Sequence, residues 1–272
     1  MSIRVSDRRV SEIEFENTGS KICDYIRQKL DKVPVRYRRN FAIPFANCLA
    51  EFEHTIIRLA DDFLESSKKN FVRSELCKEA ITLLEEIASF SYSYWILSQS
   101  KKNEIKYVCH RKRFYWAGLV NKEFGLLYGV RNKSLPKGSE VLPMRFMKPY
   151  TNEEIKDNDI LRKLSELERI AYRVANNRKN NFRDAYAERF VEVCRDASYY
   201  AFDAFSKEPE TQYLRNRRRN DLNEVIGLLF EANRLIRKMM FDHVLKEKDL
   251  EKVCTLSTDV ITELKTIRNS DL

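Results

Sequence analysis

The sequence predicts an all-α protein, and three observations lead to this prediction. Gly and Pro, the residues that most disfavour helices, occur only 6 times each among 272 residues. The hairpin dipeptides Asn-Gly and Asp-Gly are absent from the chain. Hydrophobic residues make up 43% of the chain and recur at alternating spacings of three and four. This spacing places them on one face of a helix, where they can form a buried core.

The apolar pattern also predicts an internal repeat, because the second half of the chain matches the first when it is shifted by about 145 residues. One stripe runs Phe45, Cys48, Phe52, Ile56 and Leu59, and its counterpart runs Val191, Cys194, Ser198, Phe202 and Phe205. A second stripe runs Ala80, Leu83, Ile87, Phe90 and Tyr94, and its counterpart runs Val225, Leu228, Ala232, Leu235 and Met239. A third stripe runs Ile105, Val108, Tyr115 and Leu119, and its counterpart runs Leu250, Val253, Val260 and Leu264. Stripes of this kind are core-facing seams of packed helices.

We therefore expect two tandem antiparallel up-down four-helix bundles, joined by a partly ordered linker. The expected helices lie near residues 18–32, 42–66, 73–98 and 102–118, and then near 159–177, 181–206, 214–245 and 247–268. Short connections between them favour antiparallel neighbours. The expected segments are a flexible arm at 1–17, the first bundle at 18–128, the linker at 129–157 and the second bundle at 158–272. The linker shows no helical period, and we expect burial of Leu142, Met144, Phe146 and Met147 to order part of it.

Several classes of protein are excluded by the sequence. No apolar run approaches the roughly 20 residues that a membrane span requires, and the polar start MSIRVSDRRV does not resemble a secretory signal. The six cysteines are scattered, as in cytoplasmic proteins that keep their thiols reduced. Neither a metal-ligand spacing nor a nucleophile, phosphate-loop or dinucleotide motif occurs. We therefore expect a cytoplasmic protein with no cofactor, no metal and no catalytic residue.

The chain has 50 Lys and Arg against 41 Asp and Glu, a formal charge of +9, and some of its basic residues gather in four clusters. The clusters lie at the ends of expected helices, where clustered cations suit contacts to phosphates. The predicted nucleic-acid-binding residues are Arg36, Arg38 and Arg39; Lys101, Lys102, Lys106, Arg111, Lys112 and Arg113; Arg178, Lys179 and Arg183; and Arg215, Arg217, Arg218 and Arg219. The last cluster opens a helix, where cations oppose the helix dipole, and a bound anion would relieve that conflict.

Aromatic residues follow one of these clusters in the sequence RKRFYW. Stacking of Phe114, Tyr115 and Trp116 on unpaired bases is one interpretation. The favoured interpretation is structural: Tyr115 belongs to a core-facing stripe, and Trp116 packs against the linker.

An enzymatic alternative rests on Arg237 and His243. Their spacing fits the Arg-x4–6-His signature of HEPN-type ribonucleases, which are also small helical domains. However, a Lys follows Arg237, where that family tends to carry a small polar residue, and the first half of the chain has no equivalent pair.

The segment from residue 29 to 61, KLDKVPVRYRRNFAIPFANCLAEFEHTIIRLAD, resembles the first loop and second helix of Avd proteins. These four-helix-bundle proteins are the accessory variability determinants of diversity-generating retroelements. The matching positions are Pro34, Arg36, Arg39, Ile56, Ile57, Arg58 and Ala60. The segment RKRFYWAGLVNKEFGLLYGV is similar to a basic–aromatic segment in proteins of the same neighbourhood. The second half of the chain has Arg183 at the corresponding turn but lacks the proline, and a fused tandem departs from the usual single bundle.

The resemblance implies an accessory role: binding a structured RNA and a reverse transcriptase, with bundles that assemble into rings, which allows a homo-oligomer. Together with the basic clusters, it predicts a non-enzymatic RNA-binding scaffold, the partner of a reverse transcriptase in a bacterial or phage retroelement or defence system. Two alternatives stay open: the HEPN-like helical ribonuclease, and a purely protein-binding helical adaptor.

Overall fold

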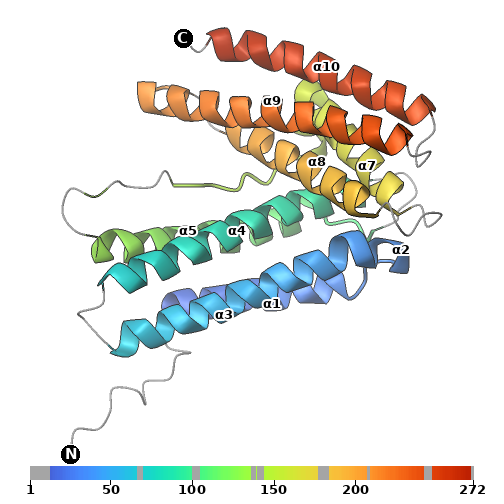
Figure 1. The fold of residues 1–272 in the computed structure, drawn as a ribbon. Helices are drawn as coiled ribbons and strands as arrows, with labels where there is room; N and C mark the ends of the chain where they lie inside the picture. Colours follow the sequence, from blue (N-terminus) through green and yellow to red (C-terminus); the bar gives the residue numbers. More distant parts are fainter. Residues whose placement is uncertain are drawn as a thin grey trace, which may run out of the picture. The chain divides into compact units, whose positions relative to one another are not determined.

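The structure is a computed structural model, and it describes residues 13–65, 70–99, 105–135, 139, 144–176, 184–206, 209–241 and 247–270. All regular secondary structure in these ranges is helical, which confirms the all-α prediction (Figure 1). Within them, no helix is long and apolar enough to cross a membrane.

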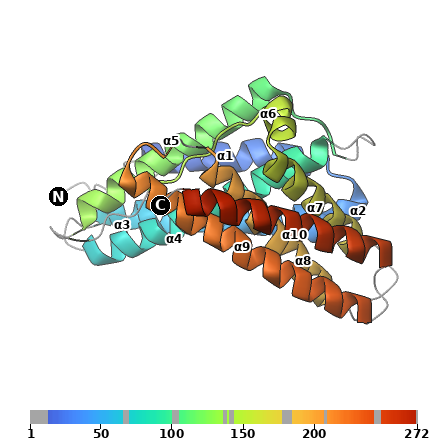
Figure 2. The ribbon, with the colours of Figure 1, turned by 90° about the horizontal axis from the view of Figure 1, so that it is seen from above.

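The helices of the first half are α1 (Glu14–Leu30), α2 (Val35–Tyr37), the π-helical turn η3 (Arg38–Ala42), α3 (Ile43–Glu65), α4 (Asn70–Ser98) and α5 (His110–Ser134). Those of the second half are α6 (Asn152–Asp157), α7 (Asp159–Ala175), α8 (Asp184–Ala204), α9 (Gln212–Phe241) and α10 (Glu247–Ser270) (Figure 2). A capping box starts α6, because the Thr151 hydroxyl and the Glu154 carboxylate each accept a hydrogen bond from the other residue's backbone N–H.

The helices form two compact units that do not follow the two halves of the sequence. The first unit consists of Met1–Val33, Ala42–Ala88 and Cys109–Met147. The second unit consists of Pro34–Phe41, Ser89–Val108 and Lys148–Leu272. The second unit therefore includes the arginine-rich turn that precedes α3 and the last ten residues of α4.

Side-chain contacts show that the neighbouring helices of the first unit run antiparallel. Between α1 and α3, an ion pair joins Arg27 to Glu53, and farther along the two helices the rings of Phe15 and Phe63 meet edge to face. Gly19 lies between these contacts, and a Cβ atom there would come within 2.4 Å of the Ile56 side chain. The glycine thus permits the close approach of α1 and α3.

The neighbouring helices of the second unit are also antiparallel. Helix α7 packs on α8 and α10, and α9 packs on the same two helices. Helices α8 and α9 are joined by Arg189–Glu231 near one end and by Arg217–Asp203 near the other. Lys163 on α7 holds Glu263 on α10 at 2.6 Å.

Each unit buries a glutamate in its core. Glu123 on α5 and Glu168 on α7 are both 0% exposed. Burial raises the pKa of the Glu123 carboxyl well above its usual value and that of Glu168 to about 7. The nearby hydroxyls of Ser93 and Ser198 oppose this rise in the pKa of Glu168. Both carboxyls therefore stay protonated and neutral at a higher pH than an exposed glutamate does.

The apolar stripes predicted for the second and third helices face the core in both halves. Phe45, Cys48, Phe52, Ile56 and Leu59 are buried, and so are their counterparts Val191, Cys194, Ser198 and Phe202. Phe205 at the end of the series is half-buried. In the third helix, the buried members are Ala80, Ile87, Phe90, Tyr94, Val225, Ala232, Leu235 and Met239. The aligned pair Leu83 and Leu228 is only half-buried.

The fourth helix of the first half differs from the prediction. We expected it at 102–118, but it starts at His110 and continues to Ser134. Ile105 and Val108 are buried in the extended segment that precedes it, whereas their counterparts Leu250 and Val253 lie in α10. The match of the fourth helices is therefore wrong at its start. The apolar spacing alone could not distinguish a buried extended segment from a helical turn.

The expected linker is correspondingly shorter. Helix α5 continues through Gly125 and Gly129 because its buried residues keep the helical spacing, and burial outweighs the low helix propensity of glycine. Of the apolar residues expected to be buried, Met147 is 1% exposed, but Met144 and Phe146 are exposed. Leu142 and most of the expected arm lie outside the described residues.

Candidate nucleic-acid interface

The first predicted cluster spans α2, which carries Arg36, and the π-helical turn η3, which carries Arg38 and Arg39. Pro44 explains the position of this π-helical turn. Proline has no N–H to donate, and its ring collides with the carbonyl group four residues earlier. A wider π-helical turn over Arg38–Ala42 removes this conflict while the chain stays helical from Val35 onward. Pro44 therefore determines the local backbone that presents the arginines.

Three residues of this turn anchor it in the second unit. Tyr37 is 7% exposed, and Phe41 is 0% exposed among other aromatic rings. The Asn40 side-chain amide donates hydrogen bonds to the Ala175 carbonyl oxygen at 2.9 Å and to the Asn176 side-chain oxygen at 3.0 Å. These bonds satisfy polar groups at the carboxyl end of α7. The backbone of the turn is thus fixed by two buried rings and by the hydrogen bonds of Asn40.

The arginines of the turn point away from these anchors. Arg36, Arg38 and Arg39 are exposed. The Arg36 guanidinium lies 5.4 Å from the centre of the Tyr37 ring. Arg39 pairs with Glu188 at 3.4 Å, and their side chains are 65% and 46% exposed. An ion pair this exposed contributes at most about 1 kcal/mol, so a phosphate group can compete with Glu188 for Arg39. We call this group the RYRR turn.

The second cluster divides between the surface and the core. Lys106, Arg111 and Lys112 are exposed, but Arg113 is only 1% exposed. The prediction that Arg113 contacts a phosphate is therefore wrong, because α5 turns this side chain inward. Lys101 and Lys102 lie outside the described residues, as does the whole third cluster of Arg178, Lys179 and Arg183.

Of the aromatic residues after this cluster, Trp116 is buried as the structural interpretation predicts, whereas Tyr115 is not. Trp116 is buried at 1% exposure, with its ring edge-on to Tyr25. Tyr115, expected in the core, is 54% exposed, and Phe114 is 66% exposed. The register of Tyr115 was inferred from Ile105 and Val108, which are not on the same helix, so the stripe placed Tyr115 on the wrong face.

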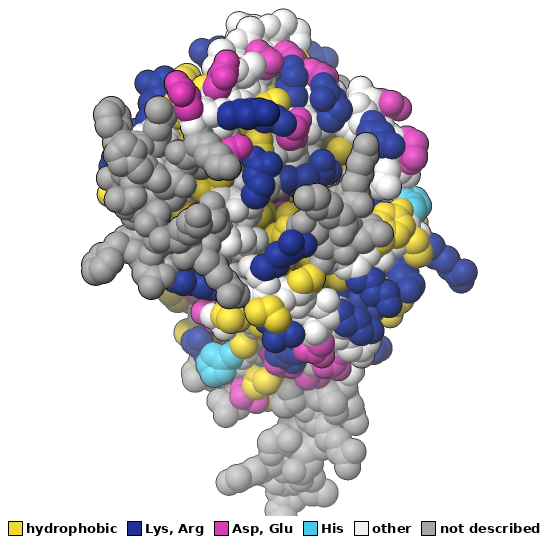
Figure 3. Space-filling view, turned by 90° about the vertical axis from the view of Figure 1, so that its right-hand side faces the viewer, with side chains coloured by type: hydrophobic (Ala, Val, Ile, Leu, Met, Phe, Trp, Pro, Cys, Tyr) yellow, Lys and Arg dark blue, Asp and Glu magenta, His cyan; other side chains and the backbone are white. Residues whose placement is uncertain are grey.

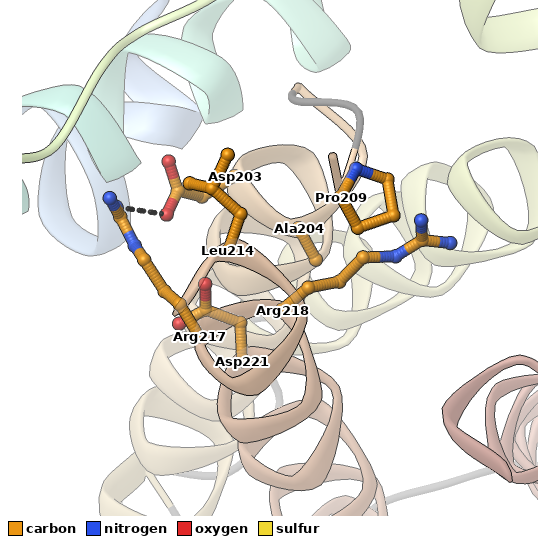
Figure 4. A pocket seen from close by; sticks show the side chains of 7 residues that line it. All are labelled: Asp203, Ala204, Pro209, Leu214, Arg217, Arg218 and Asp221. Carbon is orange, nitrogen blue, oxygen red and sulfur yellow. Dashed lines mark hydrogen bonds and ion pairs between the residues drawn. The ribbon is translucent and has the colours of Figure 1, made fainter. Parts of the chain in front are cut away.

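The fourth cluster, at the start of α9, is largely engaged by the protein itself. Arg217 pairs with Asp203 at 2.9 Å, and their side chains are only 10% and 3% exposed. The Arg218 guanidinium lies 5.6 Å from the centre of the Phe205 ring. Arg217 and Arg218 extend in opposite directions from α9 (Figure 4). Arg215 is exposed and donates to the Pro209 carbonyl oxygen at 3.2 Å, and Arg219 is half-buried.

This arrangement also answers the dipole conflict noted from the sequence. Helix α9 begins at Gln212, so the arginines follow its first turn, and the influence of the dipole falls off within that turn. The cavity between Asp203, Leu214 and Arg218 encloses only about 10 Å³. That is the size of one water-sized probe, too small for a phosphate group. Asp203 balances the charge of Arg217 here.

The two described clusters of the second unit lie at opposite ends of α8. The RYRR turn meets α8 at Glu188, and the 215–219 cluster meets it at Asp203. Fifteen residues of helix separate these contacts by about 22 Å. The clusters therefore do not form one compact site. On the face shown in Figure 3, Lys and Arg side chains are interspersed with Asp and Glu.

A basic groove that the sequence analysis did not single out lies between α9 and α10. It is lined by Phe230, Asn233, Arg234, Arg237, Thr258, Ile261, Thr262 and Lys265, and has a volume of about 480 Å³. Phe230 is 55% exposed. Arg234 and Arg237 follow Phe230 by four and seven residues, which places all three on one face of α9. That spacing was visible in the sequence, but on this helix the sequence analysis considered only the buried stripe, the 215–219 cluster and Arg237 with His243.

Two of the three histidines lie in the described residues. His54 and His110 are both exposed. His243, the partner of Arg237 in the ribonuclease alternative, lies outside the described residues. The described part of the chain also contains no group of three His, Cys, Asp or Glu side chains arranged for a metal.

Comparison of the chain with protein-family models, curated proteins and solved structures finds no match. The function of these surfaces is therefore argued from their own side chains. The RYRR turn and the α9/α10 groove each bring three cations together on helical backbone, and the proposals below concern these two surfaces.

Proposed function

We propose that this chain is a non-enzymatic RNA-binding scaffold built from two tandem four-helix bundles. The observation that carries the proposal is the RYRR turn, where three exposed arginines project from a backbone anchored by Tyr37, Asn40 and Phe41. Guanidinium groups held in this way can contact phosphates without a large cost of ordering the backbone.

The antiparallel packing supports the two-bundle part of this proposal. In the second unit each of α7, α8, α9 and α10 packs on two of the others, as in an up-down bundle. The proposed repeat also agrees with burial at positions that the sequence comparison did not use. Leu84 and Leu229, which the shift of 145 residues aligns, are both 0% exposed.

The Avd resemblance supplies the proposed biological setting. Pro34 and the exposed Arg36 and Arg39 fall at the turn that carries the resemblance. In that setting the protein would be a cytoplasmic component of a ribonucleoprotein, with a reverse transcriptase as partner and ring assembly through its bundles. Copurification of a reverse transcriptase with the chain from its native cell tests this part.

Binding would be electrostatic. Arginines that neutralise phosphates release the counterions condensed on the RNA, so affinity falls as salt concentration rises. Because the RYRR turn presents charge and not a pattern of base-specific donors, it would position an RNA and leave sequence selection to other contacts.

The first test is RNA retention by the full chain purified at low salt. We expect an excess of absorbance at 260 nm that RNase removes and a high-salt wash strips. The triple variant Arg36→Gln, Arg38→Gln, Arg39→Gln should retain much less RNA. The matched control is the triple variant Lys21→Gln, Lys78→Gln, Lys133→Gln, which removes three exposed cations from the first unit. This control should retain as much RNA as the wild-type chain.

A clean protein spectrum at low salt would contradict the proposal and favour a protein-binding adaptor. Equal loss of RNA from both triple variants would show that net charge, and not the RYRR turn, causes the retention.

A further inference from the structure

We infer that the α9/α10 groove binds single-stranded RNA by stacking an unpaired base on Phe230 while Arg234, Arg237 and Lys265 contact the phosphates. The inference deepens the proposed function and rests on it. It assigns a second, separate contact surface and the class of RNA that this surface recognises.

The exposure of Phe230 is the first argument. Phe230 is 55% exposed, on the outer face of a helix whose inner face carries the buried stripe. One turn earlier stands Gly227, where a Cβ atom would have no neighbour within 4 Å. The ring therefore rises from a locally bare helix surface, and a planar group can approach it.

The shape around the ring is the second argument. Phe230 and Arg234 line two hollows, so they form a ridge between them. The hollow toward α10 has a volume of about 480 Å³, and the hollow along α9 has a volume of about 380 Å³. These volumes are in the range of small-molecule binding sites and can hold a nucleoside.

The charge of the groove is the third argument, and it indicates an anion. The hollow toward α10 is lined by the cations Arg234, Arg237 and Lys265, and the described residues that line it include no carboxylate. Glu231 lines only the other hollow, and Arg189 already pairs with it at 2.9 Å. An uncompensated set of three cations attracts a polyanion more strongly than a neutral partner.

Their spacing suits an extended strand. Arg234 follows Phe230 by about one helical turn and Arg237 by about two, so a strand that lies along α9 meets a cation about every 5 Å. The Lys265 ammonium lies 5.6 Å from the centre of the Phe230 ring. A base that stacks there displaces this flexible side chain toward the adjoining phosphate, where its charge is again neutralised.

The ring distinguishes single strands from duplexes. A base inside a duplex is already stacked on its neighbours and cannot offer its face to Phe230, whereas an unpaired base can. Tyr186 is a second exposed aromatic ring with a cation beside it. It is 39% exposed, and the Lys238 ammonium lies 5.4 Å from its ring centre.

The test uses the full chain and a fluorescein-labelled single-stranded RNA of about twelve nucleotides without self-complementarity, with fluorescence anisotropy as the readout. Phe230→Leu keeps an apolar side chain but removes the ring, and we expect it to weaken binding about tenfold. Phe230→Tyr should restore binding. The matched control is Tyr213→Leu, which removes an exposed ring near the other end of α9.

A duplex of the same length provides the second comparison. Phe230→Leu should leave duplex binding unchanged, whereas Arg234→Gln should weaken the binding of both forms. If the wild-type chain binds the single strand but Phe230→Leu and Arg234→Gln bind as tightly as wild type, this inference is wrong and the proposed function stands. If the wild-type chain binds neither RNA, both are wrong. Capture of poly-L-glutamate with the same dependence on Arg234, and without RNA binding, would assign the groove to an acidic protein partner and overturn the inference.

Discussion

The buried Glu168 carboxyl makes the stability of the second unit depend on pH. Its side chain is 0% exposed, and burial raises its pKa from 4.5 to about 7 against the opposing effects of Ser93, Ser198 and Arg195. Between these two values the folded chain holds a proton that the unfolded chain has released. Stability therefore falls as pH rises through this window and becomes constant above about pH 7.

The size of the effect follows from the pKa difference. A shift of about 2.5 units at 1.36 kcal/mol per unit corresponds to about 3 kcal/mol of stability lost between pH 4.5 and pH 8. Glu168→Gln preserves the shape of the side chain and removes the titration. The variant should therefore match the wild-type stability near pH 5 and exceed it by up to about 3 kcal/mol at pH 8.

The two tryptophans allow the second unit to be measured by itself. Trp95 belongs to the second unit and Trp116 to the first, and they are the only two in the chain. In a Trp116→Phe background, Trp95 fluorescence during urea unfolding reports the second unit. The separation is necessary because the first unit carries its own buried carboxyl, Glu123, whose pKa is also raised.

Glu166→Gln is the matched control for this measurement. Glu166 lies on the same helix, is partly exposed and pairs with Lys252. Its replacement should leave the pH dependence of unfolding unchanged. The reasoning is refuted if the second unit is equally stable at pH 5 and pH 8, or if Glu168→Gln retains the wild-type dependence.

Three further predictions concern packing, charge and thiol reactivity. Gly19→Ala forces a Cβ atom into the contact between α1 and α3 and should destabilise the chain by about 1–3 kcal/mol. The matched variant Gly118→Ala meets open space in a helix and should stabilise the chain by about 0.5–1 kcal/mol. Equal melting temperatures of the two variants would contradict this prediction. Arg217→Ala removes the ion pair with the buried Asp203 carboxylate and should cost about 3 kcal/mol in urea unfolding, against at most about 0.5 kcal/mol for the exposed Arg215→Ala. Iodoacetamide at pH 8 should alkylate the exposed Cys109 in the folded protein, as read by peptide mass spectrometry, before it reaches the buried cysteines with raised pKa values, Cys23, Cys77 and Cys194.

The sequence predicted the long helices well because their apolar stripes continue over about four turns. The stripe from Phe45 is buried as expected, and so is the stripe from Val225 apart from the half-buried Leu228, since packing and helix period agree there. The prediction failed where tertiary burial outweighs local preference. Val108 is buried without being helical, and α5 runs through Gly125 because its flanking residues are buried. These effects depend on partners distant in the chain, so local spacing could not reveal them.

The candidate site was predictable only as a set of charges. Sequence clustering identified the arginines of the RYRR turn, which the structure shows to be exposed. It could not show that Arg113 points inward or that Arg217 is neutralised by a residue of another helix. It also missed the groove at Phe230, because an exposed ring and a core ring have the same letter in a sequence. Which face of a helix is covered depends on the neighbouring helices.

The most direct test of the RNA-binding claim is the salt dependence of single-stranded RNA affinity for the full chain. The logarithm of the association constant should fall linearly with the logarithm of the salt concentration. In the triple variant Arg36→Gln, Arg38→Gln, Arg39→Gln, the slope should become shallower by about 2, because three phosphate contacts of about 0.7 each are lost. An affinity independent of salt, or an unchanged slope in the triple variant, would contradict the claim that these arginines bind RNA.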